Sequence, residues 1–344
     1  MKKIGLFMFL WAYTVLTLTG VSIRAQDSAS IPGAPKAQLV TVEPGVKLEV
    51  LDWGGTGRPV VLLAGLGSTA HEFDTFAPKL TSKYHVYGIT RRGFGASDTP
   101  PVAGENYLAD RLGDDVIAVL DVLKLEHPVL VGHSIAGEEL SSIGSRFPNR
   151  VAGLVYLDAG YAYALYNASG GDVQAVFQVD TNELLRQLLA INNSISAADR
   201  AKIMEAVLKE LPNYERLLAA RQKVLATFPP MTTQRREAAA AQMKTRDAMS
   251  SLAVIHAEQR YTDIECPVLA IFAEPHSVDP STSPKDRATE EEADVEEVEP
   301  QAKAFEALGS NVRVVRIPHA DHAIFRSNEA EVLRAMNSFI ATLQ

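Results

Sequence analysis

The stretch Val129-Leu130-Val131-Gly132-His133-Ser134-Ile135-Ala136-Gly137 decides the fold of this chain. It begins as a short apolar run, which predicts a buried strand, and residues 136–146 that follow predict a helix. Ser134 therefore stands on a strand-to-helix turn, flanked by the small residues Gly132 and Ala136. Such a crowded turn can expose a serine hydroxyl as a nucleophile. A serine that merely caps the helix is the alternative.

Short strands and helices alternate on both sides of this turn. The alternation predicts a mostly parallel sheet that is covered by helices on both faces. A hairpin of Gln38–Val42 and Val46–Asp52 precedes it. The expected strands are Val60–Ala64, Val86–Thr90, Pro128–Val131, Val151–Leu157, Val268–Phe272 and Val312–Ile317, and the expected helices are Tyr107–Leu123, Ala136–Arg146, Gln301–Leu308 and Asn328–Leu343.

A long helical stretch, residues 161–262, interrupts the alternation and divides the expected core into residues 26–160 and 263–344. Ligands of open α/β sheets bind beyond the carboxyl ends of the strands. An insertion after a strand is therefore placed to act as a cap, or lid, over a ligand. Helices that only pack on the core are the alternative.

Residues 274–300 are strongly acidic and poor in apolar side chains. Low hydrophobicity with charge of one sign predicts a solvated, mobile loop within the core. The stretch lacks the spacing of an EF-hand calcium loop, so we expect no metal site there.

Composition limits the function classes. The 344 residues carry 33 Lys and Arg against 42 Asp and Glu, a net charge of −9. This acidic balance argues against a nucleic-acid partner. Cys266 is the single cysteine, so the chain forms no internal disulfide.

The N-terminal residues 1–25 predict an export signal. Lys2 and Lys3 precede an uncharged, largely apolar run, which ends before the small residue Ala25. We expect cleavage after Ala25, a periplasmic or secreted protein, and no stable membrane insertion afterwards. An uncleaved segment that anchors the chain is the alternative.

A second glycine-rich turn, Gly65-Leu66-Gly67, follows the expected strand Val60–Ala64. In an acyl-transfer enzyme this loop supplies a backbone N–H group to the oxyanion hole. We assign that role to Leu66, and the partner N–H to Ile135, the residue after the serine. An ordinary strand-to-helix turn is the alternative.

Five segments together resemble the α/β-hydrolase superfamily, of the type with a helical cap. The resemblance spans Gln38 to Leu343 and implies an α/β-hydrolase fold without specifying a substrate. Superfamily dehalogenases and epoxide hydrolases use an aspartate nucleophile, so Ser134 argues against both activities. The segments are Ala64-Gly65-Leu66, Arg91-Arg92-Gly93-Phe94-Gly95-Ala96-Ser97-Asp98, Gly132-His133-Ser134-Ile135-Ala136-Gly137, Leu157-Asp158-Ala159-Gly160 and Pro318-His319-Ala320-Asp321-His322.

The resemblance places the catalytic base in the loop after the last strand. It favours His322, with His319 as the alternative. A zinc site formed by these two histidines lacks a third ligand in the sequence.

The sequence offers more than one carboxylate that could orient the histidine. Family members usually carry it after the strand equivalent to Val268–Phe272, where this sequence has His276. Some members place it one strand earlier, which is the position of Asp158. We therefore prefer Asp158 as the acid, with Asp279 and then Glu274 as alternatives.

These residues predict a serine hydrolase with the triad Ser134, His322 and Asp158. The expected substrate is a small or medium carboxylic ester, which the enzyme cleaves through an acyl-enzyme, as a carboxylesterase of class EC 3.1.1 does. The mechanism requires no metal or organic cofactor. A ligand-binding or sensor protein on the same fold is the alternative, and the oligomeric state stays open.

Overall fold

The computed structural model of the protein describes residues 34–103, 105–193, 196–225, 233, 237 and 244–344. The expected export signal, residues 1–25, lies outside these residues and stays a prediction. In the part of the chain that is described, no helix combines the length and the apolar character needed to cross a bilayer.

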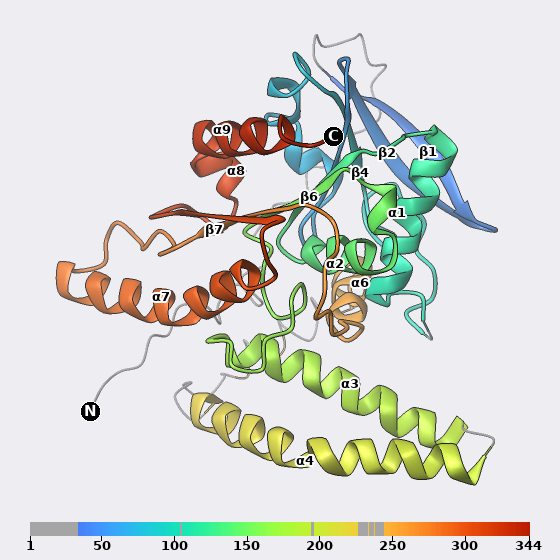
Figure 1. The fold of residues 1–344 in the computed structure, drawn as a ribbon, viewed down its shortest axis with the longest axis vertical. Coiled ribbons are helices and arrows are strands. Elements are labelled where there is room, and N and C mark those ends of the chain that lie inside the picture. Colours follow the sequence, from blue (N-terminus) through green and yellow to red (C-terminus); the bar gives the residue numbers. More distant parts are fainter. Residues whose placement is uncertain (1–33, 104, 194–195, 226–232, 234–236, 238–243) are drawn as a thin grey trace.

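An eight-stranded sheet forms the centre of the molecule, with the strand order β1-β2-β4-β3-β5-β6-β7-β8 (Figure 1). β1 pairs with β2 and β2 with β4 in antiparallel fashion, and every other neighbouring pair is parallel. The parallel strands therefore end at one common edge. The strands are β1 (Lys36–Glu43), β2 (Val46–Gly54), β3 (Pro59–Leu63), β4 (His85–Ile89), β5 (Val129–His133), β6 (Gly153–Leu157), β7 (Val268–Ala273) and β8 (Val312–Ile317).

Helices cover both faces of the sheet, as the sequence predicts. In β3, Val61 and Leu63 pack into one core cluster while Val60 and Leu62 pack into the other, because successive side chains of a strand point to opposite faces. Burial on both faces explains why the parallel strands are continuous apolar runs. The first cluster includes α1 (Ala109–Leu123), α2 (Ala136–Arg146) and α7 (Pro284–Glu306), and the second includes α8 (Ile324–Ser327) and α9 (Glu329–Ile340).

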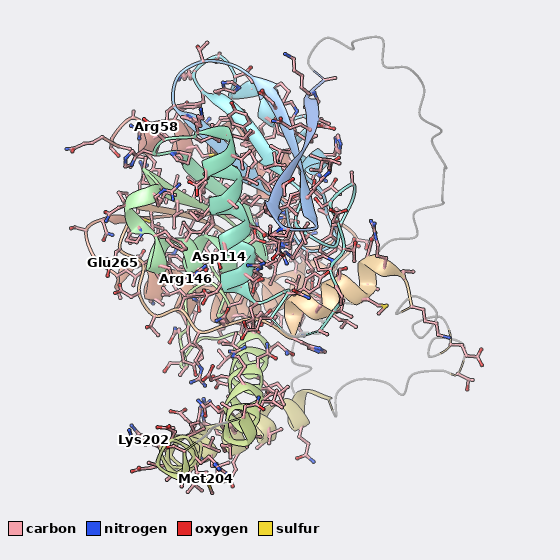
Figure 2. All side chains as sticks on the ribbon, turned by 90° about the vertical axis from the view of Figure 1, so that its right-hand side faces the viewer. Arg58, Asp114, Arg146, Lys202, Met204 and Glu265 are labelled. Atoms are coloured by element: carbon pink, nitrogen blue, oxygen red, sulfur yellow. The ribbon has the colours of Figure 1, made fainter. Side chains whose placement is uncertain are left out.

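Helices α3 (Val173–Asn193), α4 (Ala197–Leu225) and α6 (Arg246–Ile255) lie between β6 and β7 in the chain. They occupy the stretch for which the sequence predicts a helical cap. α3 and α4 lie side by side below the sheet (Figure 1), and Lys202 and Met204 mark the part of α4 that lies far from it (Figure 2). Val254 of α6 instead packs beside Ile135, next to the serine.

The acidic stretch 274–300 is not a loop throughout, because helix α7 begins at Pro284 and continues to Glu306. The Ser283 side chain caps the helix by accepting a hydrogen bond from the backbone N–H of Asp286. The expectation of a mobile loop is therefore wrong over residues 284–300. The sequence pattern does not indicate this helix because it is strongly acidic and buries only one narrow stripe of side chains. That stripe consists of Val298, Gln301, Ala302 and Phe305.

Candidate active site

Ser134 lies between the end of β5 and the start of α2, as the strand–turn–helix pattern predicts. Its φ angle is +54°, in the left-handed region that residues other than glycine rarely adopt. The backbone N–H of Ser134 donates to the carbonyl oxygen of Leu157 at 3.3 Å, which ties the turn to the end of β6. A strained turn of this kind persists only where its surroundings hold it.

Small residues around the turn are required by close packing. A Cβ atom on Gly132 would lie 3.1 Å from the Cβ of Ala136 and 2.9 Å from Leu140. A Cβ atom on Gly137 would lie 2.0 Å from the carbonyl oxygen of Ala159, a distance that no Cβ atom can adopt without a clash. Larger residues at these positions would force α2 away from the sheet and move Ser134.

The structure brings Ser134, His322 and Asp158 together. His322 Nε2 lies 2.8 Å from Ser134 Oγ, and His322 Nδ1 lies 2.6 Å from Asp158 Oδ2. The serine follows β5, the aspartate follows β6, and the histidine follows β8. Three segments that are distant in sequence meet because parallel strands end at one edge of the sheet. This arrangement can pass a proton from the hydroxyl to the imidazole, with the carboxylate orienting the ring.

The alternative residues lie elsewhere. Asp279 is exposed and accepts a hydrogen bond from the backbone N–H of Ser281 at 2.7 Å. His319 is exposed, with Nδ1 3.4 Å from a carboxylate oxygen of Glu291. Glu274 is buried, and its side chain faces Arg316. The carboxylate that contacts His322 is therefore that of Asp158.

Leu66 and Ile135, the residues expected at the oxyanion hole, lie near each other. Their side chains join one apolar cluster with Phe94 and Val254. Among the residues that the structure describes, neither backbone N–H has a hydrogen-bond acceptor. Their part in an oxyanion hole stays a prediction.

Two buried charged residues hold the loop that contains Leu66. The Arg91 guanidinium donates to the carbonyl oxygens of Ala64 at 3.0 Å and Gly65 at 3.4 Å, and it pairs with Glu139. Glu72 Oε1 accepts the backbone N–H of Gly65 at 2.8 Å. The sequence indicates only that the Arg91 segment shapes the sheet near the site, and it gives no role to Glu72.

Asp158 is fully buried and fully hydrogen-bonded. Besides His322, its carboxylate accepts from His276 Nε2 at 2.8 Å, from the Tyr161 hydroxyl at 3.3 Å and from the backbone N–H of Ala273 at 3.0 Å. Burial alone would raise the pKa of Asp158, but the attraction of His276 and the hydrogen bonds from both histidines outweigh it. The pKa of this carboxyl therefore lies well below its usual range.

The pKa of His322 is also lowered, but for a different reason. Burial lowers the pKa of its imidazole, and the Asp158 carboxylate opposes this effect without cancelling it. The ring is then neutral at neutral pH, which is the form that can accept the proton of Ser134.

The ligand atoms of Asp158, His276 and His322 lie within 4.8 Å of one another, a spacing that a metal ion could use. However, Asp158 Oδ2 is within hydrogen-bonding distance of a nitrogen of each imidazole. A nitrogen that donates a proton has no free lone pair for a metal. The donor arrangement therefore fits a proton-transfer site better than a metal site.

Comparison with known proteins supports the same fold. Epoxide hydrolase A of Mycobacterium tuberculosis is 40% identical over 103 residues, which cover 29% of this chain and 31% of that protein. The AB hydrolase superfamily protein YisY of Bacillus subtilis is 30% identical over 149 residues, covering 39% of this chain and 53% of that protein. The matched segments thus span about a third to a half of these relatives.

Solved structures resemble nearly the whole chain at low identity. A putative acyltransferase from Salmonella enterica has a TM-score of 0.57 at 17% identity, covering 92% of this chain and 98% of that one. A thermophilic esterase from Thermogutta terrifontis has a TM-score of 0.52 at 19% identity, covering 89% and 98%. Residues 60–335 also match the profile of the Alpha/beta hydrolase family. The chain therefore belongs to the α/β-hydrolase family.

Proposed function

We propose that the protein is a serine hydrolase that cleaves small or medium carboxylic esters through an acyl-enzyme. The observation that carries the proposal is the continuous contact from Ser134 Oγ to His322 Nε2, at 2.8 Å, and from His322 Nδ1 to Asp158 Oδ2, at 2.6 Å. A serine hydroxyl needs an adjacent base and an orienting group to act as a nucleophile.

The first half-reaction transfers the acyl group to the enzyme. Ser134 Oγ attacks the carbonyl carbon of the ester while neutral His322 accepts the hydroxyl proton at Nε2. The Asp158 carboxylate stabilises the imidazolium that forms. The N–H groups of Leu66 and Ile135 hold the oxyanion of the tetrahedral intermediate. His322 then gives its proton to the leaving-group oxygen, and the alcohol departs.

The second half-reaction releases the carboxylic acid product from Ser134. His322 takes a proton from water, and the resulting hydroxide attacks the acyl carbon bound to Ser134 Oγ. The intermediate collapses when His322 returns the proton to the serine.

Labelling with a fluorophosphonate probe tests the proposal, with mass spectrometry of the labelled peptide and turnover of p-nitrophenyl esters of increasing chain length. We expect one adduct per chain, on Ser134. We expect Ser134→Ala to abolish labelling and to lower kcat by about 10⁵- to 10⁶-fold, because the nucleophile is lost. Ser141→Ala is the matched control, since Ser141 is buried in α2 and contacts the Tyr156 hydroxyl.

Unchanged turnover in a folded Ser134→Ala variant would refute the proposal. Labelling of Ser134 without multiple turnover would instead favour the ligand-binding or sensor function.

A further inference from the structure

His276 lies beside the predicted triad, on the turn that follows β7. Its backbone bridges to Ala320, in the loop that carries His322. Its side chain is mostly buried, and Nε2 lies 2.8 Å from Asp158 Oδ2. This is the oxygen that also contacts His322, so the Asp158 carboxylate lies between two imidazoles.

The other side of the His276 ring faces a second carboxylate. Asp294 of α7 has its two carboxylate oxygens 3.0 and 3.1 Å from His276 Nδ1. One of these oxygens also accepts the backbone N–H of His276 at 2.7 Å. Because carboxylates are acceptors only, an imidazole that bonds one with each nitrogen carries a proton on both. His276 is therefore an imidazolium ion held between Asp158 and Asp294.

We propose that His276 is a positioning residue of the serine hydrolase site. Its imidazolium, fixed by Asp294, holds the Asp158 carboxylate toward His322 and offsets part of its negative charge. His322 thus stays unprotonated, and able to accept a proton, at lower pH than it would beside an isolated aspartate. The inference rests on the proposed function, because it concerns the base of that reaction.

The surrounding charges are consistent with this role. Burial acts against the charged form of His276, yet Asp158 and Asp294 together raise its pKa to about 11. The Tyr161 hydroxyl lies 3.5 Å from Nε2 and is neutral, because burial raises its pKa well above the usual range. Glu297 of α7 also faces His276, and burial raises its pKa to about 8, so it is mostly protonated near neutral pH.

The cationic ring is close enough to act on His322. The two ring centroids are 6.3 Å apart, and at that distance two like charges in a partly buried site repel appreciably. The charge of His276 therefore lowers the pKa of His322, in addition to the effect of burial and of the His133 imidazole, whose ring centroid lies 4.9 Å from that of His322.

The test is the pH dependence of the second-order rate constant for phosphonylation of Ser134, which requires no knowledge of the substrate. In His276→Gln the amide can still donate to Asp158, but the positive charge is gone. We expect the acidic limb of the profile to move upward by about one pH unit, because His322 is protonated more easily. His85→Gln is the matched control, since His85 Nε2 pairs with Asp52 at 2.8 Å, away from the site. Its profile should not move.

A second variant keeps the test independent of how well His276→Gln folds. Asp294→Asn leaves His276 in place and removes a negative charge behind it. We expect the acidic limb to move by a few tenths of a pH unit in the opposite direction, downward. A folded His276→Gln protein with the wild-type limb would overturn the inference, and so would an Asp294→Asn limb that stays or moves upward. If the wild-type protein is not labelled at all, it is the proposed function that fails.

Discussion

Asp158 and Glu138 are both fully buried carboxyl groups near the serine turn, and their surroundings differ. Asp158 follows β6 and accepts hydrogen bonds from two imidazoles, a hydroxyl and a backbone N–H. Glu138 lies in the first turn of α2, and neither of its carboxyl oxygens has a hydrogen-bond partner among the described residues. The partners of Asp158 outweigh the effect of burial and depress its pKa, whereas burial and the neighbouring Glu258 raise the pKa of Glu138 well above its usual value.

The difference teaches that several hydrogen-bond partners together can outweigh burial in setting the charge of an interior carboxyl group. Glu138 even lies at a helix N-terminus, where the helix dipole favours an anion by about 0.3–1 kcal/mol. Desolvation of a charge costs several kcal/mol, so it outweighs the dipole. Asp158 is therefore the charged carboxylate of the site, and Glu138 is held as a neutral acid.

Of the changes to these carboxyl groups, removing the charge of Asp158 has the largest expected effect on activity. We expect Asp158→Asn to lower kcat for a p-nitrophenyl ester by about 10⁴-fold, because an amide neither stabilises the imidazolium nor fixes the correct tautomer of His322. Asp279→Asn serves as the control and should retain wild-type turnover, because Asp279 is exposed and its carboxylate accepts hydrogen bonds from Ser281, away from His322. A loss in Asp279→Asn with full activity in Asp158→Asn would move the acid to the later strand.

Glu139, the neighbour of Glu138, extends the comparison to a third buried carboxyl group, one that pairs with Arg91. We expect Arg91→Ala to lower the free energy of unfolding by about 3–5 kcal/mol, because it leaves Glu139 without a buried counter-charge. The change also frees the carbonyl oxygens of Ala64 and Gly65. Urea unfolding measures the effect.

The control for that variant is Arg150→Ala. Arg150 pairs with Asp121 at the surface, where an ion pair contributes at most about 1 kcal/mol. An equal loss of unfolding free energy in the two variants would show that the buried Arg91–Glu139 pair stabilises the fold no more than a surface ion pair does.

Much of the fold and part of the site are predictable because their signals are local. Ser134 is marked by the residues next to it, and the strands by short apolar runs that are buried on both faces. The sequence favours Asp158 only through the family resemblance, and the structure places it at the end of β6, which lies beside β5. The catalytic roles of these residues stay predictions until the kinetic tests are made.

The rest depends on contacts that the sequence does not encode locally. Asp294 belongs to an acidic run, and only the docking of α7 against β7 and β8 brings it to His276. Glu138 and Glu139 are adjacent and chemically identical, yet only Glu139 meets a guanidinium. Which of two neighbouring acids finds a partner is a property of the packed structure.

The smallest effect tests the neutral state of Glu138. Its folded-state pKa is raised, so the folded protein holds this proton to higher pH than the unfolded chain does. Stability therefore falls as the pH rises from the unfolded pKa toward the folded one. Glu138→Gln resembles the protonated acid and cannot ionise. We expect the variant to match the wild type near pH 4, below the unfolded pKa, and to be more stable by about 1–3 kcal/mol near pH 9, the range of the desolvation penalty of a buried polar group. Urea unfolding at the two pH values measures the difference, and Glu139→Gln, which weakens the Arg91 pair, should be destabilised at both. A Glu138→Gln effect that is independent of pH would mean that Glu138 is already charged in the folded protein, and the contrast with Asp158 would not hold.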